Sequence, residues 1–328
     1  MIKKVIKFTF LSVLILVIGF VVGVLLNGIN FSRFKEEVLY TDWMKNINDD
    51  TYLNDIVIPG SHDAGSYDMV WLGETQKYTI EEQLNVGVRY FDIRVNYKDG
   101  EYVIFHSIIN GVKFIPILND IKEFIIKNPT EVLLLDFQHF NGKSQSGVYD
   151  LITEYLYDNN LLVVNDTTKS DLEFINSLKL KDVRGKCIIF WGDRSSDLSN
   201  YVFLRNNDNC SHDNMSLNSY YESEYHENSN ILFNNGYELY FNNIVDKINK
   251  EGKGIFVLQG QLTDLKLIFG PWSKEKVHNK FMNEQIEKFK TSENLKYLNV
   301  VMRDFIDGAK CKDIINLNFY KNNMSEMI

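Results

Sequence analysis

The sequence is poor in cysteine and in clustered positive charge, and each of these shortages excludes some classes of function. Its three cysteines, Cys187, Cys210 and Cys311, cannot form a closed set of disulfides. No CxxC pair or Cys/His cluster with the spacing of a zinc site is present in the sequence. Lysine and arginine total 35 against 44 acidic residues, a net charge of −9, and no long basic run occurs. Because phosphate binding needs clustered Lys and Arg, we expect no nucleic-acid partner.

Residues 1–28 carry the strongest compositional signal. Three lysines within the first seven residues precede an uncharged stretch over residues 8–26, which is about long enough to cross a bilayer as a helix. The segment also resembles a secretory signal, although no small-x-small cleavage site is evident. We predict an uncleaved signal anchor, with a cleaved signal peptide as the alternative, followed by a stalk at residues 29–44. The rest of the chain would then lie on the extracellular face of the membrane, or be secreted if the segment is cleaved.

Short apolar runs alternate with stretches of helical spacing through the remainder, residues 45–320. Most of the runs are nearly continuous rather than alternating, which is typical of strands buried on both faces of a parallel sheet. This pattern predicts an α/β fold with a closed (β/α) barrel, and a doubly wound open sheet is the alternative. No GxGxxG follows the first run, which argues against dinucleotide binding. The predicted strands are residues 56–60, 88–93, 102–105, 132–137, 187–191, 255–258 and 298–302.

Three segments between these strands predict helices. The first has Thr79 as N-cap, Glu82 as its capping-box partner and Gly87 as terminator. The second, PILNDIKEFIIKNP, is amphipathic, and the third, SKEKVHNKFMNEQIEKFK, would be capped by Ser273. Residues 195–235 are rich in Asn, Ser and Asp, and they predict a long loop inserted at the rim of the barrel.

Polar residues follow the predicted strands one after another. In a parallel barrel the carboxyl ends of the strands meet on one face, where the chemistry takes place. Each strand-end residue alone is compatible with a structural role, such as a buried ion pair, but the series is much less expected by chance. The strand ends supply His62, Asp63, Asp92, Arg94, His106, Asp136, Gln138, His139, Asp193, Arg194, Gln259, Gln261, Arg303 and Asp304.

Two histidines with carboxylate partners and an arginine suit the cleavage of a phosphodiester by an internal hydroxyl. The histidines would act as general base and general acid, and Arg94 would hold the phosphate with its planar fork. A metal hydrolase that uses His62, Asp63, Asp92 and His106 as ligands is the alternative. An arginine in the same cluster argues against that alternative because it would fill the place of the cation.

Several of these stretches resemble the X domain of phosphatidylinositol-specific phospholipase C. The likeness rests on IPGSHDAGSYDMVW, TQKYTIEEQLNVGVRYFDIRV, FHS, EVLLLDFQHFNG, QGQLTD and VVMRDF, in that order. It covers roughly residues 45–310 and is strongest to the small single-domain branch, which includes bacterial enzymes and X-domain-containing proteins. The resemblance implies a distorted TIM-like barrel and a two-step reaction that uses no metal or other cofactor.

The resemblance also implies a role for each residue of the catalytic set. His62 would be the general base on the inositol 2-hydroxyl, and His106 would protonate the leaving oxygen of diacylglycerol. Arg94 would bind the phosphate, Asp304 would orient His62, and Asp63 would do the same for His106. The first product would be inositol 1,2-cyclic phosphate. Calcium-dependent relatives have an acidic ligand where this chain has FDIR, so Arg94 also argues against calcium.

The expected head-group contacts depart from the bacterial pattern. The bacterial enzymes have a lysine after the fourth strand, whereas this chain reads LLDFQHF, with Asp136 and His139. We expect Asp136, His139, Arg194, Gln259 and Gln261 to line the substrate pocket, although the two glutamines are equally compatible with strand-end hydrogen bonds. The expected substrate is phosphatidylinositol or a related phospholipid at a membrane surface. Another phospholipid head group, or a catalytically silent lipid-binding module, remains as an alternative.

Overall fold

The structure, a computed structural model, describes residues 11–20, 38–141, 144–166, 168–192, 201–206, 217–219, 254–261 and 270–325. The chain divides into two compact units, Met1–Glu37 and Val38–Ile328. In the first unit, residues 11–20 are described, and they form an exposed helix. None of the described helices is both long and apolar enough to cross a membrane. The predicted anchor at residues 1–28 lies mostly outside the described residues and stays a prediction.

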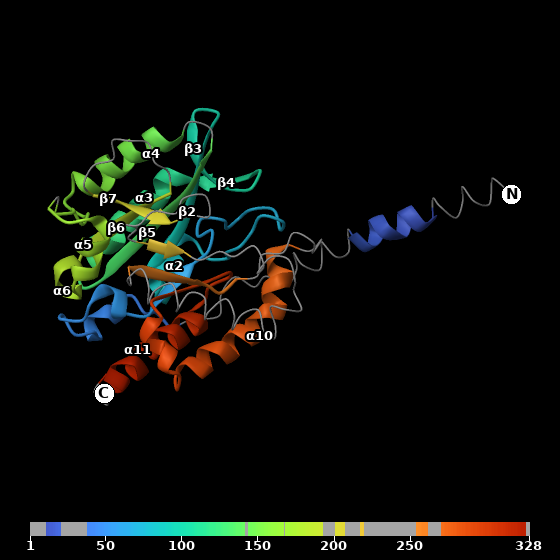
Figure 1. The fold of residues 1–328 in the computed structure, drawn as a ribbon. Coiled ribbons are helices and arrows are strands. Elements are labelled where there is room, and N and C mark those ends of the chain that lie inside the picture. Colours follow the sequence, from blue (N-terminus) through green and yellow to red (C-terminus); the bar gives the residue numbers. More distant parts are fainter. Residues whose placement is uncertain are drawn as a thin grey trace. The chain divides into compact units, whose positions relative to one another are not determined.

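The second unit is built on a ring of eight strands that are all parallel (Figure 1). Each strand pairs with the next along the chain, and the last pairs with the first, which closes the ring. The predicted closed α/β barrel is therefore confirmed. The strands are β1 (Ile58–Ser61), β2 (Tyr90–Lys98), β5 (Val132–Asn141), β6 (Lys186–Trp191), β7 (Val202–Asn206), β8 (Leu217–Ser219), β9 (Ile255–Gln259) and β10 (Val300–Arg303).

Helices surround this ring in Figure 1. Helix α2 has the predicted capping box between Thr79 and Glu82, and Gly87 ends it with a φ of 116°, a value that favours glycine. Helix α10 begins at Pro271 with Gly270 as its N-cap, so the predicted cap at Ser273 is wrong. The α-helices are α2 (Ile80–Val86), α3 (Phe114–Lys127), α4 (Ser144–Ile152), α5 (Asp171–Ser177), α6 (Leu180–Val183), α10 (Pro271–Phe289) and α11 (Gly308–Ser325). Shorter turns are η1 (Trp43–Asn46), η2 (Leu53–Asp55), η3 (Thr153–Tyr157) and η5 (Glu293–Tyr297).

Strand β3 (Glu101–His106) is not a member of the ring, contrary to the sequence prediction. It pairs antiparallel with β2 and then with β4 (Ile109–Lys113), which forms a hairpin extension of the sheet. The connection from β2 is Asp99-Gly100, with φ values of 53° and 86°. A two-residue turn of this kind joins antiparallel strands, whereas a parallel crossover needs a dozen residues or more. His106 therefore reaches the site from the end of a hairpin.

The segment predicted to be a rim insertion, residues 195–235, supplies two strands of the ring. Its described residues 201–206 and 217–219 contain β7 and β8. The predicted stalk also ends earlier than expected, because residues 38–44 belong to the second unit. Trp43 donates a hydrogen bond to the carbonyl of Gly87 at 3.0 Å, and Met44 is fully buried. The folded body therefore begins before the predicted boundary at residue 45.

Alternate residues of the ring strands pack into two different apolar cores. Tyr90 of β2 and Phe190 of β6 belong to the core inside the ring, together with Val257 and Met302. Their neighbours along the strands belong to the core between the ring and helices α2, α3, α10 and α11. This alternation follows from the two-residue period of a strand. It also determines which later residues of each strand point inward at the carboxyl end.

Candidate active site

A layer of polar side chains covers the apolar interior at the carboxyl end of the ring. On β2, Asp92 and Arg94 follow the inward-facing Tyr90 at steps of two residues. The same step leads from Met302 on β10 to Asp304. The inward positions at the strand ends are held by His62, Asp92, Arg94, Asp136, Arg205, Gln259 and Asp304. The predicted strand-end residues thus converge because they lie at inward-facing positions, two residues apart along each strand.

His62 is held by a carboxylate on its far side. Its Nδ1 lies 2.7 Å from Oδ1 of Asp304, and the side chain of Asp304 is 4% exposed. Because a carboxylate accepts, Nδ1 carries the proton of this hydrogen bond, and Nε2 is left facing the pocket. Burial alone would lower the pKa of His62, but the carboxylates of Asp63 and Asp304 outweigh burial and raise the pKa to about 9.

Arg94 lies between two buried carboxylates. Its Nε is 2.7 Å from Oδ1 of Asp63, and its Nη2 donates to Oδ2 of Asp92 at 2.9 Å. The same Nη2 is 3.4 Å from Nε2 of His62. Burial lowers the pKa of Arg94, but Asp63 and Asp92 raise it above its ordinary value, so the guanidinium stays charged. The site therefore offers a fixed positive charge beside the free nitrogen of His62.

Asp63 joins the two histidines through one carboxylate oxygen. Its Oδ2 is 3.4 Å from Nε2 of His62 and 3.6 Å from Nε2 of His106. The residue has a φ of 43°, and its backbone N–H donates to Asp92 at 3.2 Å. Burial raises the pKa of Asp63, but Arg94 and the two histidines outweigh it and lower the pKa. Asp63 is therefore a carboxylate that holds Arg94, His62 and His106 around one point.

His106 is oriented by the backbone of a loop. Its Nδ1 is 2.9 Å from the carbonyl oxygen of Gly73, which can only accept. This contact leaves Nε2 pointing toward Asp63. The side chains of His106 and Arg94 are 23% and 18% exposed, whereas that of Asp63 is 1% exposed. A ligand would therefore reach the imidazole and the guanidinium, while the carboxylate stays behind them.

His62, Asp63 and Asp92 also form a group of possible metal ligands, with ligand atoms within 4.8 Å of one another. The guanidinium of Arg94, however, already contacts both carboxylates of this group. A divalent cation would have to displace Arg94 and would lie against its positive charge. This arrangement fits an anion such as a phosphate better than it fits a metal ion.

Asp136 is buried below the surface that a substrate head group would contact. It is fully buried, and it accepts hydrogen bonds from Tyr90 at 2.5 Å and Gln138 at 3.0 Å. Arg205 pairs with it at 2.8 Å. Burial raises the pKa of Asp136 to about 6, although Arg205 lowers it. Of this group Arg205 and Tyr90 were missed from the sequence, and the apolar run YVFL before Arg205 is the signal that could have indicated a strand.

The other residues predicted to line the pocket differ in where the structure places them. Gln259 and Gln261 are buried, and Gln261 donates to Gln259 at 2.9 Å. His139 is exposed and pairs through its backbone with Arg94 across β2 and β5, so it lies at the rim. Arg194 lies outside the described residues. The structure thus brings Gln259 and Gln261 to the polar layer and leaves His139 beside it.

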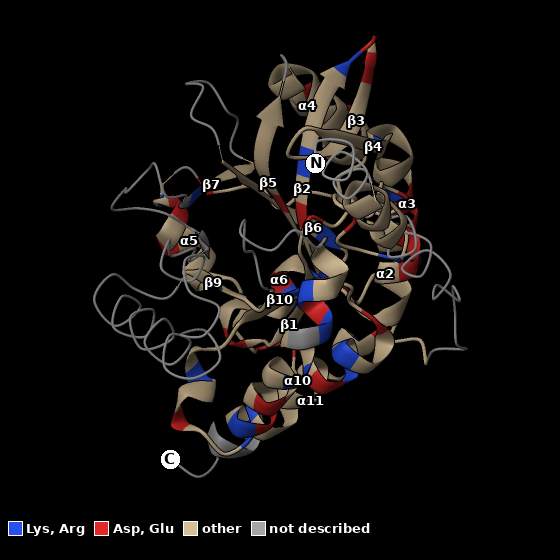
Figure 2. Cartoon of the chain, turned by 90° about the vertical axis from the view of Figure 1, so that its right-hand side faces the viewer, with Lys and Arg blue, Asp and Glu red and all other residues tan. Residues whose placement is uncertain are grey.

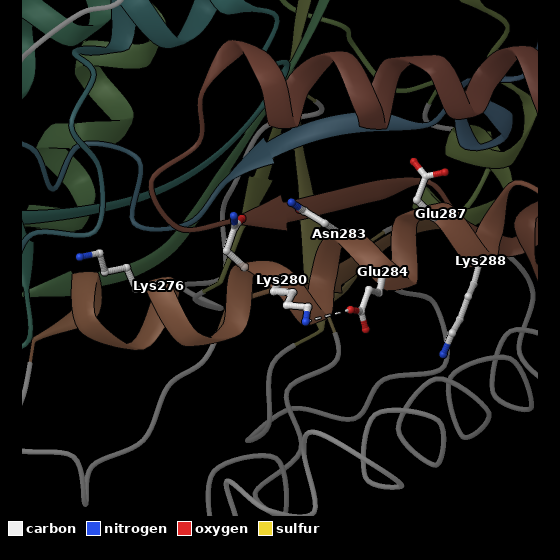
Figure 3. Close-up of a pocket in the computed structure, with 7 residues that line it drawn as sticks. Lys276, Lys280, Asn283, Glu284, Glu287 and Lys288 are labelled. Carbon is white, nitrogen blue, oxygen red and sulfur yellow. Dashed lines mark ion pairs between the residues drawn. The ribbon is translucent and has the colours of Figure 1, made fainter.

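A separate groove runs along the outer face of α10, with a volume of about 690 Å³ (Figure 3). It is lined by Lys276, Asn279, Lys280, Asn283, Glu284, Glu287 and Lys288, which all come from this helix. None of them belongs to the polar layer of the barrel. Figure 2 shows acidic and basic residues mixed along α10 and α11, without a continuous face of one sign in that view. This groove is therefore a feature of the helix surface and not of the candidate site.

Comparisons with known proteins show similarity in sequence and in fold. Residues 50–192 match the family model of the phosphatidylinositol-specific phospholipase C X domain. A 1-phosphatidylinositol phosphodiesterase of Listeria monocytogenes is 32% identical over 169 residues, which cover 47% of this chain and 50% of that protein. The human PI-PLC X domain-containing protein 2 is 31% identical over 152 residues, which cover 35% of this chain and 48% of that protein. The chain thus spans about half the length of the curated relatives it matches.

The solved structure of phosphatidylinositol-specific phospholipase C from Listeria monocytogenes has the same fold. It superposes with a TM-score of 0.65 at 22% identity, over 85% of this chain and 99% of that one. At this identity the likeness concerns the fold alone. Residues 50–192 are thus similar in sequence to the X domain of phosphatidylinositol-specific phospholipase C, and the chain has the fold of the Listeria enzyme.

Proposed function

We propose that the chain is a phospholipase C that cleaves the glycerol–phosphate bond of phosphatidylinositol. The observation that carries the proposal is the placement of two imidazoles around one arginine, with the Asp63 carboxylate between them. General acid–base catalysis needs two titratable groups on either side of the reacting atom. A fixed cation between them stabilises the charge that develops on the phosphate oxygens. The relatives named above support the choice of phosphatidylinositol as the substrate.

In the proposed first step, the inositol 2-hydroxyl attacks phosphorus and its proton passes to Nε2 of His62. Asp304 holds the tautomer that leaves this nitrogen free to accept. The bond between phosphorus and the glycerol oxygen breaks, and His106 gives a proton to that oxygen. Diacylglycerol and inositol 1,2-cyclic phosphate are the products. Arg94 neutralises the phosphate throughout, and Asp63 and Asp92 fix its position.

The proposed reaction uses no metal. Support comes from the guanidinium of Arg94, which fills the space between Asp63 and Asp92 where a cation would bind. A charge-neutralising role in phosphoryl chemistry is then already supplied by the protein. Activity should therefore be insensitive to a chelator.

A different phospholipid head group is the second candidate, and the burial of Asp136 favours it. Its carboxylate is taken up by Tyr90, Gln138 and Arg205, so it is not free to bind inositol hydroxyls. The polar residues that specify a head group in this chain would then be others of the layer. Such a substrate must still offer a hydroxyl near phosphorus, or water must attack.

The proposed location is the extracellular face of a membrane, with residues 1–28 as anchor or signal. Exposed apolar side chains beside His106 support action at a lipid surface. Val70 and Leu72 are 60% and 51% exposed and precede Gly73, whose carbonyl contacts His106. Ile108, in the turn two residues after His106, is 92% exposed. Apolar side chains in contact with water at the mouth of a site are typical of an interaction surface.

The experiment that tests the proposal uses the full chain with phosphatidylinositol in mixed micelles, with and without a chelator. Phosphorus NMR would follow a five-membered cyclic phosphate. We expect this product at an unchanged rate with chelator, and its loss in the His62→Ala and His106→Ala variants. Turnover of another phospholipid in a head-group panel would favour the second candidate. Loss of turnover with chelator would contradict the role of Arg94, and no turnover of any lipid would contradict an enzyme.

A further inference from the structure

The turn that follows Asp304 at the end of β10 has an unusual backbone conformation. Phe305, the next residue, has a φ of 44°, a left-handed value that is a genuine outlier for a bulky residue. Such a conformation persists only where the surrounding structure holds it. The ring of Trp272 packs edge-on against Phe305 at a centroid distance of 4.9 Å. The direction of the Asp304 side chain thus depends on what fixes this turn.

A lysine of the following helix holds the turn from one side. The Nζ of Lys310 donates to the carbonyl oxygens of Asp304 and Phe305, each at 2.9 Å. Its third hydrogen bond goes to Oε1 of Glu275 at 2.5 Å. An ammonium has three donors, and all three are used here. Lys310 therefore links the backbone carbonyls on both sides of Phe305 to helix α10.

This contact is buried and anchored. Lys310 is 9% and Glu275 3% exposed, and Oε1 of Glu275 also accepts from Arg303 at 3.0 Å. Burial lowers the pKa of Lys310, while Glu275 opposes that effect. Without the ammonium, two carbonyls of a buried turn would lose their donor, and an unpaired buried polar group is costly.

The opposite side of the turn is held by the loop before α2. Phe305 donates its N–H to the carbonyl of Thr75 at 2.7 Å, and Ile306 donates to Oε1 of Gln76 at 3.0 Å. Gln76 in turn donates to the carbonyl of His62 at 2.8 Å. The backbones of His62 and Asp304 are therefore fixed relative to each other on this side, and Lys310 completes the restraint on the other.

We propose that Lys310 is a positioning residue that sets the Asp304 carboxylate against His62. It contacts neither the substrate pocket nor His62, and it acts through the backbone of Asp304 and Phe305. Its effect on turnover rests on the proposed phospholipase activity, but its effect on His62 does not. The charged groups that face His62 are Asp304 from the end of β10, Asp63 from β1, and Asp92 and Arg94 from β2.

The test is Lys310→Met in the full chain, with the titration of His62 followed by NMR of labelled histidine. The sequence has six histidines, and the signal that disappears in His62→Gln assigns His62. A loosened Asp304 raises the pKa of His62 less, so we expect a lower pKa in the variant. Simple removal of a positive charge would instead raise the pKa. The sign of the change therefore separates positioning from charge.

Turnover gives the second readout. A misplaced Asp304 should lower kcat by about 10- to 100-fold, because small errors in catalytic geometry have effects of this order. KM should stay within about two-fold, because Lys310 does not touch the substrate. The matched control is Lys321→Met, which removes another buried lysine of α11 that donates to a backbone carbonyl, that of Leu298 at 2.8 Å. We expect this control to leave kcat and the titration of His62 unchanged.

The outcomes are distinguishable. A lower pKa of His62 in Lys310→Met supports the inference even if the parent chain turns over no phosphatidylinositol, in which case the proposed function fails alone. An unchanged or raised pKa, matching Lys321→Met, would overturn it. If Lys310→Met does not fold, Lys310→Gln replaces it. That variant also removes the positive charge, but its shorter side chain keeps an amide donor, so it should lower the pKa of His62 in the same direction by less, and an unchanged or raised pKa there overturns the inference.

Discussion

The pKa of His62 is raised by its neighbours at the site. The carboxylates of Asp63 and Asp304 raise its pKa to about 9 despite burial. Because a general base must be unprotonated, kcat/KM should rise with pH up to about 9. Asp304→Asn removes one of the two carboxylates that raise the pKa of His62. The rise of kcat/KM with pH should therefore occur at lower pH in this variant. Rate profiles from pH 5 to 10 on micellar substrate measure this.

The same profile on Asp158→Asn, a change at an exposed carboxylate on the surface, provides the control. Its rise of kcat/KM with pH should coincide with that of the parent chain. A rise that stays in place in Asp304→Asn would mean that His62 is not the group that titrates in the rate.

Arg94 differs from a lysine in that it reaches two carboxylates at once. Its Nε contacts Asp63 and its Nη2 contacts Asp92, and a single ammonium cannot reproduce this fork. Arg94→Lys should therefore lower kcat/KM by about 100-fold or more, a loss typical of one removed charge-stabilising donor. Steady-state rates measure it. The control Arg184→Lys makes the same chemical change before β6, at the opposite end of the strands, and equal losses in both variants would refute a specific role.

Many residues of the site could be anticipated because each follows an apolar strand. His62, Asp63, Arg94 and Asp304 stand at or just beyond such runs. Parity along the strands brings His62, Arg94 and Asp304 together, whereas Asp63 directly follows His62 and lies in a turn with a φ of 43°. Arg205 could not be anticipated in the same way. Its strand is short and lies in a stretch rich in Asn and Ser, so the local pattern indicated a loop.

At the scale of elements, the residues that connect two strands decide how those strands pair. The Asp-Gly pair at residues 99–100 is a signal for a tight hairpin, and it makes β3 antiparallel. Strand β8, with the sequence LNS, has no apolar pattern at all. It is a strand because its neighbours β7 and β9 offer backbone partners, which is information that no local window contains.

The loop before α2 and the β3–β4 turn together form an apolar rim, defined here as Val70, Leu72 and Ile108. They meet at Gly73, whose carbonyl contacts His106 and where any added side chain would meet that of Ile109. If the substrate lies in a membrane, Ile108→Asp combined with Leu72→Asp should reduce turnover in vesicles by about 10-fold or more, because buried apolar area drives the insertion. Turnover of a water-soluble short-chain analogue should be unchanged.

Vesicle sedimentation with the same variants measures binding directly. Phe319→Asp, at another exposed apolar residue that is 68% accessible on α11, is the matched control and should bind like the parent chain. Equal losses on vesicles and on the soluble analogue would show that the rim acts on the site itself rather than on the lipid surface.

At the scale of the whole molecule, the barrel was predictable because continuous apolar strands require cover on both faces. The boundaries of the body were not. Trp43 and Met44 pack under the ring through Gly87 and Glu131, contacts between segments far apart in the chain. A stretch of polar sequence around two such residues gives no local sign that it belongs to the core.

The free energy of unfolding should also depend on pH through the titration of His62. A histidine whose pKa rises from 6.5 to about 9 on folding binds its proton more tightly in the native state. Its contribution to the free energy of unfolding is fully present below pH 6.5 and is lost as the pH rises through about 9. The loss should be about 3.5 kcal/mol at most, since the pKa rises by about 2.5 units and one unit corresponds to about 1.4 kcal/mol.

Urea unfolding at intervals from pH 6 to 9.5 measures this loss, and His62→Gln is the reference because it has no titrating group at this position. The buried Cys187 thiol, whose pKa burial raises, contributes a further fall above about pH 8.5 in both proteins, so the difference between the two curves isolates His62. The parent chain should lose stability relative to His62→Gln across the interval. Parallel curves would mean that the surrounding carboxylates do not hold the proton on His62, and the acid–base assignment of the site would fail with them.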